Sequence, residues 1–293
     1  MGGVIRLSKL FYEINLKKKI DPLAFKTTVS ELNILIPGFD WEKYILNDLF
    51  EKTFNMNVSR NQTVIIDDLE YLQKLVKIIN YESKFHEDDF DNFLIWELID
   101  SLNDIIEPSK NELLICSNYV FKNFNVLLSK FLLKDNFESE NVLKVEELIK
   151  YLRNEFKNLI YQSSWMDEKS KRFSIERINS LKFKIGYPKY IFNDSLISNE
   201  YLKYNFSNSN RSFFQNEIFR RFFNLKDNFA YLNKERNENI WLLGPSIPNA
   251  AFSVLTHEIY VPAGIIQTPI FDPDNLMLFN FARLGFIIAH EMA

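Results

Sequence analysis

Several residues that build common kinds of site are scarce in this sequence. Cysteine occurs once in 293 residues, at Cys116, which excludes an internal disulfide and any zinc cluster made of cysteines. We expect that thiol to be a small buried side chain rather than a nucleophile. Glycine occurs seven times, about a third of its ordinary share, so we expect the remaining glycines to lie where backbone freedom is needed.

Excess positive charge and long apolar runs are also missing. The net charge is −4, which excludes a strongly basic nucleic-acid-binding protein. No stretch reaches the about 18 apolar residues of a membrane-spanning helix. The N-terminal segment 1–20 has no uninterrupted apolar core, so it does not read as a signal peptide. With 46% hydrophobic and 25% charged residues, the composition is that of a globular protein with a sizeable core.

Helical periodicity dominates up to about residue 240. Asp67 or Asp68 is expected to cap a helix whose apolar stripe runs over 69–79. Ser139 precedes a second helix with apolar residues on one face over 142–160. These stripes indicate core packing.

A third helix is expected to open at Asp167. It should stop at Gly186, which can take the left-handed conformation beyond a helix end, and Pro188 prevents continuation. Further helices are predicted around 87–107, 111–133 and 211–225.

The pattern changes near Trp241. The segment 242–248 holds one glycine and two prolines, which marks a break. Residues 250–261 read as extended chain with a turn at 256–258, because β-forming residues flank that turn. The run 262–264, Pro-Ala-Gly, ends the extended part.

A last helix follows, with Asp272 or Asp274 as its cap. Its apolar positions are expected to include Leu276, Phe279, Leu284 and Ile288, and the sequence is still helical at its final residue.

This helix carries His290-Glu291-Met292-Ala293, the first four residues of the zinc-binding pattern His-Glu-x-x-His. In that pattern the two histidines lie on one helix face and bind zinc, while the glutamate polarises the metal-bound water. A His-Glu pair alone carries little information here, because His86 and His257 are also followed by glutamate. His86 reads as a solvated residue in an acidic run and His257 as a turn residue.

The surrounding residues make the last pair more specific. Three segments keep the order, spacing and identity of the neprilysin family of zinc metalloendopeptidases, and the chain resembles that family over residues ~30–293. These segments are 249–252 (Asn-Ala-Ala-Phe), 257–272 and 284–291. Upstream, Trp165-Met166-Asp167, Ile185-Gly186-Tyr187-Pro188 and the segment 35–41 resemble further parts of the same family.

The resemblance implies a role for each matching residue. His290 would be the first zinc ligand and Glu291 the catalytic base. Asn249 and Ala250 would bind the main chain of a peptide substrate from an edge strand. Zinc is thus the implied cofactor and a peptide the implied partner, while neither nucleic acid nor a transmembrane segment is expected.

The fold expected is mainly α. Residues 1–246 would form part of the family's helical N-terminal domain, and 247–293 the first strands and active-site helix of a zincin-type peptidase domain. Departures from the family also matter. His257 and Arg283 stand where the family usually has Asn and Gly, and Cys116 resembles a disulfide cysteine without a partner.

The second histidine and the third ligand are absent, and catalytic zinc takes three protein ligands. We therefore expect a family segment cut at both ends that does not hydrolyse peptides. The alternatives are an incomplete record of an active endopeptidase, a non-catalytic peptide-binding or interaction module, and a gene remnant. The family suggests an extracellular or plasma-membrane ectodomain, although this sequence carries no signal or anchor.

Overall fold

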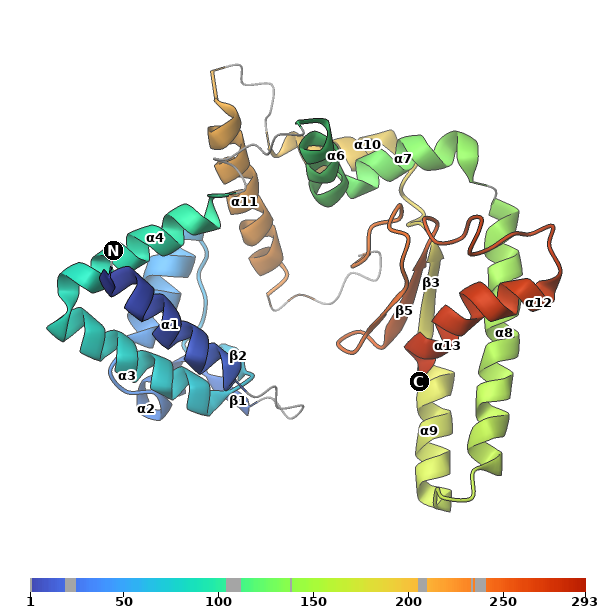
Figure 1. Cartoon of the computed structure of the whole chain (residues 1–293), viewed down its shortest axis with the longest axis horizontal. Helices are drawn as coiled ribbons and strands as arrows, with labels where there is room; N and C mark the ends of the chain where they lie inside the picture. Colours follow the sequence, from blue (N-terminus) through green and yellow to red (C-terminus); the bar gives the residue numbers. More distant parts are fainter. Residues whose placement is uncertain are drawn as a thin grey trace. The chain divides into compact units, whose positions relative to one another are not determined.

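The structure is a computed structural model that describes residues 2–18, 25–103, 112–137, 139–204, 210–232, 234 and 241–293. The chain divides into two units, residues 1–107 and residues 108–293. Figure 1 shows the elements of both units.

The first unit combines helices with a two-stranded antiparallel sheet. Its elements are α1 (Gly2–Leu16), β1 (Phe25–Thr28), α2 (Val29–Leu35), the π-helical η1 (Lys43–Thr53), β2 (Thr63–Ile66), α3 (Leu69–Phe85) and α4 (Glu87–Ser101). Local capping sets where two of the helices begin. Thr28 and Glu31 exchange side-chain and main-chain hydrogen bonds at the start of α2, and Asp68 accepts one from the Tyr71 N–H at 2.8 Å before α3. The predicted cap is therefore confirmed for Asp68.

Two apolar clusters stabilise this unit. One joins α2, β2 and α3, and the other joins α1 to α4. Their buried members are Leu32, Ile36, Ile66 and Val76 in the first and Leu7, Phe90 and Phe93 in the second. Next to the second cluster, Arg6 donates two hydrogen bonds, of 2.9 and 2.7 Å, to the buried carboxylate of Glu82. These bonds hold the pKa of Glu82 below its ordinary value and fix α1 on α3.

The second unit is built mostly from helices. They are α6 (Glu112–Asn123), α7 (Asn125–Asn136), α8 (Ser139–Gln162), α9 (Glu168–Ser180), α10 (Asp194–Leu202) and α11 (Phe213–Ala230). Helices α8 and α9 lie side by side as a hairpin (Figure 1). Asp167 caps α9 by accepting a hydrogen bond from the Ser170 N–H at 2.7 Å, as predicted.

Two predictions for the start of this unit are wrong. The single helix predicted over 111–133 is two helices, because the chain breaks at Phe124 between α6 and α7. Cys116 on α6 is exposed rather than buried. Its place on an outward face of α6 was not evident from residue type alone.

A three-stranded sheet carries the end of the chain. Its strands are β3 (Lys182–Gly186), β4 (Ala251–Ser253) and β5 (Glu258–Pro262), in the order β3–β5–β4. The central strand β5 is buried along its whole length, runs parallel to β3 and is antiparallel to β4. The expected extended segment with its turn is thus confirmed.

The last helical segment packs beside this sheet (Figure 1). It consists of α12 (Met277–Asn280), a π-helical turn η2 (Phe281–Gly285) and α13 (Phe286–Met292). Its core-facing side chains join α8, α9 and β5 in one apolar cluster. The fully buried members of that cluster are Val145, Leu148, Ile259, Val261, Leu284 and Ile288.

The helix predicted from Asp167 to Gly186 is wrong over its last part. Helix α9 ends at Ser180, and residues 182–186 form β3, where Lys182 lies opposite Glu258. Gly186 does have the expected positive φ, of 79°, but it ends a strand rather than a helix. The partner strand is distant in sequence, so the local pattern could not reveal the pairing.

The predicted cap of the last helix is also wrong. The helix begins at Met277 without a side-chain cap, and Asp272 lies in the preceding loop. There the buried side-chain amide of Asn280 makes two hydrogen bonds with the main chain of Asp272. Its Oδ1 accepts one from the Asp272 N–H at 3.0 Å, and its Nδ2 donates one to the Asp272 C=O at 2.7 Å. Leu276 and Phe279 are exposed, so the predicted apolar stripe reaches the core only from Leu284 onward.

Candidate functional site

Strand β4 is an edge of the sheet, paired on one side with β5 among the described residues. On its other side, the main-chain N–H of Phe252 donates a hydrogen bond of 2.7 Å to Oε2 of Glu291. Successive residues of a strand direct their main-chain groups to opposite sides. The main-chain N–H and C=O groups of Phe252 point away from β5, and so do those of Ala250, two residues earlier. The main-chain groups of Ala251 and Ser253 point toward β5.

Helix α13 brings His290 and Glu291 to this edge. Ile288 and Met292 point into the core and fix how the helix is turned. Glu291 is half-buried beside β4, and His290, one position earlier, is exposed. The helix therefore presents a carboxylate to the strand and an imidazole to solvent.

The two predicted peptide-binding residues come directly before β4. Asn249 is exposed, whereas Ala250 is buried. A close approach of two loops sets their position. The N–H of Gly264 donates to the C=O of Pro245 at 2.9 Å, and a Cβ on Gly264 would lie only 2.4 Å from the Ser246 main-chain oxygen. The loop before Asn249 can pack here only because residue 264 is a glycine.

The hairpin between β4 and β5 is tight. His257 has a φ of 52°, in the left-handed region that asparagine and histidine tolerate better than most residues. Its Nε2 lies 3.0 Å from the Arg177 main-chain oxygen, and its ring stacks edge-on against Phe252. The prediction that His257 is a turn residue is confirmed, and this turn holds β4 in place on the sheet.

The described residues do not fit a complete zinc site. Catalytic zinc takes three protein ligands. Within the part of the chain that the structure describes, no three His, Cys, Asp or Glu side chains gather closely enough to hold a metal ion. His290 offers one exposed imidazole, and Glu291 is engaged with Phe252.

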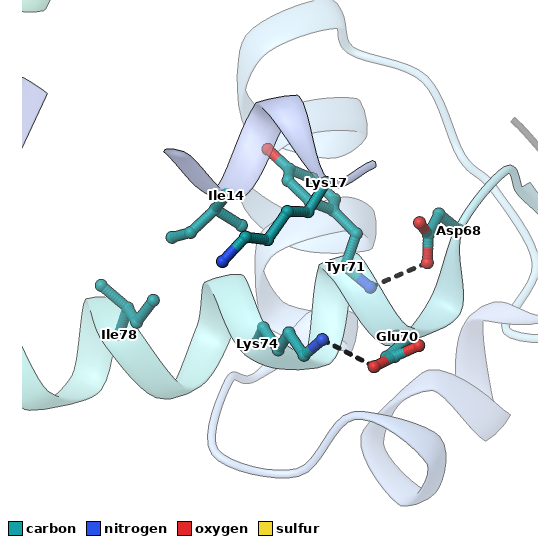
Figure 2. A pocket seen from close by; sticks show the side chains of 7 residues that line it. All are labelled: Ile14, Lys17, Asp68, Glu70, Tyr71, Lys74 and Ile78. Carbon is teal, nitrogen blue, oxygen red and sulfur yellow. Dashed lines mark hydrogen bonds and ion pairs between the residues drawn. The ribbon is translucent and has the colours of Figure 1, made fainter. Parts of the chain in front are cut away.

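A cavity of about 580 Å³ lies elsewhere, in the first unit, between the end of α1 and the start of α3 (Figure 2). Its lining residues are Ile14, Lys17, Asp68, Glu70, Tyr71, Lys74 and Ile78. Its polar groups are largely engaged, since Asp68 caps α3 and Lys74 pairs with Glu70 at 2.6 Å. None of the four residues predicted as a site lines this cavity.

A buried charge cluster joins α6 to α11. The carboxylate of Glu217, which is 1% exposed, accepts hydrogen bonds from Arg220 and Arg221, both at 2.8 Å from their Nε, and from Tyr119. Burial raises the pKa of Glu217, but these hydrogen bonds outweigh it and bring the pKa down to about 2. Sequence reasoning missed this cluster, although Glu217 and Arg221 at a four-residue spacing on one helix are a signal for an ion pair.

Two models of peptidase family M13 match the sequence, one over residues 6–188 and one over residues 249–293. The chain belongs to peptidase family M13. The predicted resemblance to neprilysin-like peptidases is confirmed, and so is the expected mainly α fold.

Curated relatives in this M13 family cover the chain almost end to end. Neprilysin of Oryctolagus cuniculus is 29% identical over 273 residues, which is 87% of this chain and 36% of that protein. Human neprilysin is 28% identical with the same coverage, and human endothelin-converting enzyme-like 1 is 22% identical over 95% of this chain and 37% of its own length. The chain thus spans a little over a third of the length of these relatives.

Solved structures share the fold. A zinc metalloprotease of Mycobacterium tuberculosis in complex with an inhibitor superposes with a TM-score of 0.72 at 16% identity, over 99% of this chain and 45% of that one. A galactose-containing glycoprotein complex of Haemonchus superposes with a TM-score of 0.58 at 21% identity, over 78% and 36%. Among the described residues of the M13 chain, no helix has the length and apolar character needed to cross a membrane.

Proposed function

We propose that residues 247–293 supply the peptide-binding edge and the first metal ligand of an M13 zinc metalloendopeptidase site. In this proposal His290 is a zinc ligand, Glu291 is the general base, and Asn249 and Ala250 hold the main chain of a peptide. Residues 1–246 then belong to the helical domain of the same family.

The observation that carries the proposal is the contact between Glu291 and the outer side of β4. It brings the carboxylate of the family's helix to the strand edge where a peptide would lie. A peptide added to an exposed edge gains main-chain hydrogen bonds, and pockets beside the strand select its side chains. Membership of family M13 and the similarity to neprilysins support a peptide as substrate.

The location proposed is an extracellular or plasma-membrane ectodomain. Its support is the family, including a relative named membrane metallo-endopeptidase-like 1. Protease accessibility of an epitope-tagged full-length gene product on intact cells would test this location.

Zinc is the proposed cofactor, but catalytic zinc takes three protein ligands, and among the described residues no three His, Cys, Asp or Glu side chains gather to hold it. A protein made of these residues alone is therefore proposed to be inactive. The test is to measure zinc by elemental analysis and chelator-sensitive peptide cleavage in tag-free protein. Neither stoichiometric zinc nor cleavage is expected. One zinc per chain with chelator-sensitive cleavage would refute the inactivity.

A second function is favoured by the same edge, namely peptide binding without hydrolysis. Main-chain pairing of a peptide with the outer side of β4 needs no metal ion, because the strand's own N–H and C=O groups make the hydrogen bonds. Under this alternative, the 293-residue protein binds peptides in the presence of a chelator, and Asn249→Ala weakens that binding. Loss of peptide binding on metal removal would exclude it.

A further inference from the structure

The open edge of β4 is already occupied by a group of the chain itself. Oε2 of Glu291 accepts the Phe252 N–H at 2.7 Å, which is the length of a strong hydrogen bond to a charged acceptor. The carboxylate reaches across from α13, whose orientation is fixed by the buried Ile288 and Met292. The contact is therefore a defined feature of the fold between two elements that are far apart in sequence.

A peptide that adds to this edge needs the same donor. Pairing with an edge strand requires the N–H groups on its outer side to donate to carbonyl oxygens of the incoming chain. Phe252 has one N–H, and a well-aligned N–H makes one such bond at a time. The Glu291 carboxylate and a peptide carbonyl thus compete for the same hydrogen.

We propose that Glu291 acts as a gate on the β4 edge, occupying the Phe252 N–H when no peptide is bound and releasing it when a peptide pairs with the strand. The inference rests on the proposed peptide-binding function and adds to it a regulation of the same site. Capping of an exposed edge by a charged side chain also suppresses pairing with another copy of the chain. Release frees the carboxylate for the peptide at the moment that a peptide arrives.

The test measures binding of a neutral tetrapeptide, acetyl-Ala-Phe-Leu-Ala-amide, to the 293-residue protein in the presence of EDTA. Because this peptide carries no charge, its binding reports main-chain pairing rather than charge attraction to the Glu291 carboxylate. EDTA removes metal ions, so the peptide cannot bind through a metal. Glu291→Ala frees the Phe252 N–H and is expected to tighten binding about tenfold or more. Glu291→Gln keeps the shape but replaces a charged acceptor with a neutral one, so a smaller gain is expected.

The matched control is Arg283→Ala on the same helical segment. Arg283 is exposed and donates to the Pro269 main-chain oxygen at 2.8 Å, away from β4. This variant should bind the peptide as the wild type does. Thermal unfolding of each variant checks that the fold is retained.

A second readout follows the Phe252 amide directly by hydrogen exchange. In the absence of peptide, this amide should exchange at least severalfold faster in Glu291→Ala than in wild type, and added peptide should restore its protection. Equal exchange in both proteins would overturn the gate, even if Glu291→Ala failed to bind peptide.

The outcomes separate the gate from the function on which it rests. Binding that Asn249→Ala abolishes and Glu291→Ala leaves unchanged overturns the gate and keeps the proposed peptide site. Absence of binding in wild type and in both Glu291 variants overturns the peptide site and the gate together. Tighter binding and faster amide exchange in Glu291→Ala support both.

Discussion

The Glu291 carboxylate and the Phe252 main-chain nitrogen lie 2.7 Å apart and join helix α13 to the edge strand β4. This bond connects the helix that carries the His-Glu pair to the strand that follows Asn249. The candidate site is therefore a strand edge and a helix in a fixed mutual arrangement, held by the same apolar core.

The first prediction concerns the loop contact at Gly264. Gly264→Ala would place a Cβ 2.4 Å from the Ser246 main-chain oxygen, so one of the two loops must move. We expect the free energy of unfolding to fall by about 2 kcal/mol or more, as for overpacked interiors. Thermal or urea unfolding measures this.

Gly285→Ala is the matched control for this loop variant. A Cβ at Gly285 would meet its nearest neighbour at 3.4 Å, and the residue lies in a helical segment where alanine is favoured over glycine. Its stability should therefore equal or exceed that of the wild type. Equal losses in the two variants would contradict the close loop approach.

The second prediction concerns the hairpin turn at His257, whose φ is 52°. His257→Asn and His257→Val both remove the imidazole and its contact with Arg177, but only valine is strained in the left-handed region. We expect the valine variant to be less stable than the asparagine variant by about 1–2 kcal/mol. Equal unfolding midpoints would show that the turn does not have this conformation.

The third prediction concerns the buried Glu217. Because its folded pKa of about 2 lies below the ordinary 4.5, its ionised form stabilises the fold at neutral pH. This contribution is complete above pH 4.5 and is lost as the pH falls toward 2. Glu217→Gln removes the negative charge that pairs with the buried Arg220 guanidinium, so we expect a loss of about 3–5 kcal/mol at pH 7.

Urea unfolding at pH 7, 4 and 3 measures this dependence. The gap in stability between wild type and Glu217→Gln should shrink steadily below pH 4.5. Glu146→Gln, an exposed glutamate on α8, is the control and should change stability little at any pH. A gap that stays constant with pH would contradict the depressed pKa.

Local sequence signals predicted where α3 and α9 begin. Asp68 and Asp167 cap α3 and α9 because an aspartate before an apolar stripe satisfies free N–H groups within three residues. The turn at His257 was predicted for a similar local reason. Each of these features is decided by neighbours in the sequence.

Features that depend on distant partners were not predicted. Residues 182–186 form a strand because β5 lies beside them, and Asp272 does not cap the last helix because Asn280 holds its main chain. The residues of the candidate site came from the family motif rather than from periodicity. The Phe252–Glu291 bond had no local signal, because it joins a main-chain donor to a side chain on a separate helix.

The central claim is that the strand edge beginning at Asn249 and Ala250 binds a peptide main chain. Titrating the neutral tetrapeptide into isotope-labelled protein tests it most directly. The account predicts that amide signals of residues 250–253 shift on titration. It also predicts that Asn249→Ala weakens binding, while Asn158→Ala, an exposed asparagine on α8, does not. Shifts confined to other parts of the chain, or equal affinity in all three proteins, would contradict the claim.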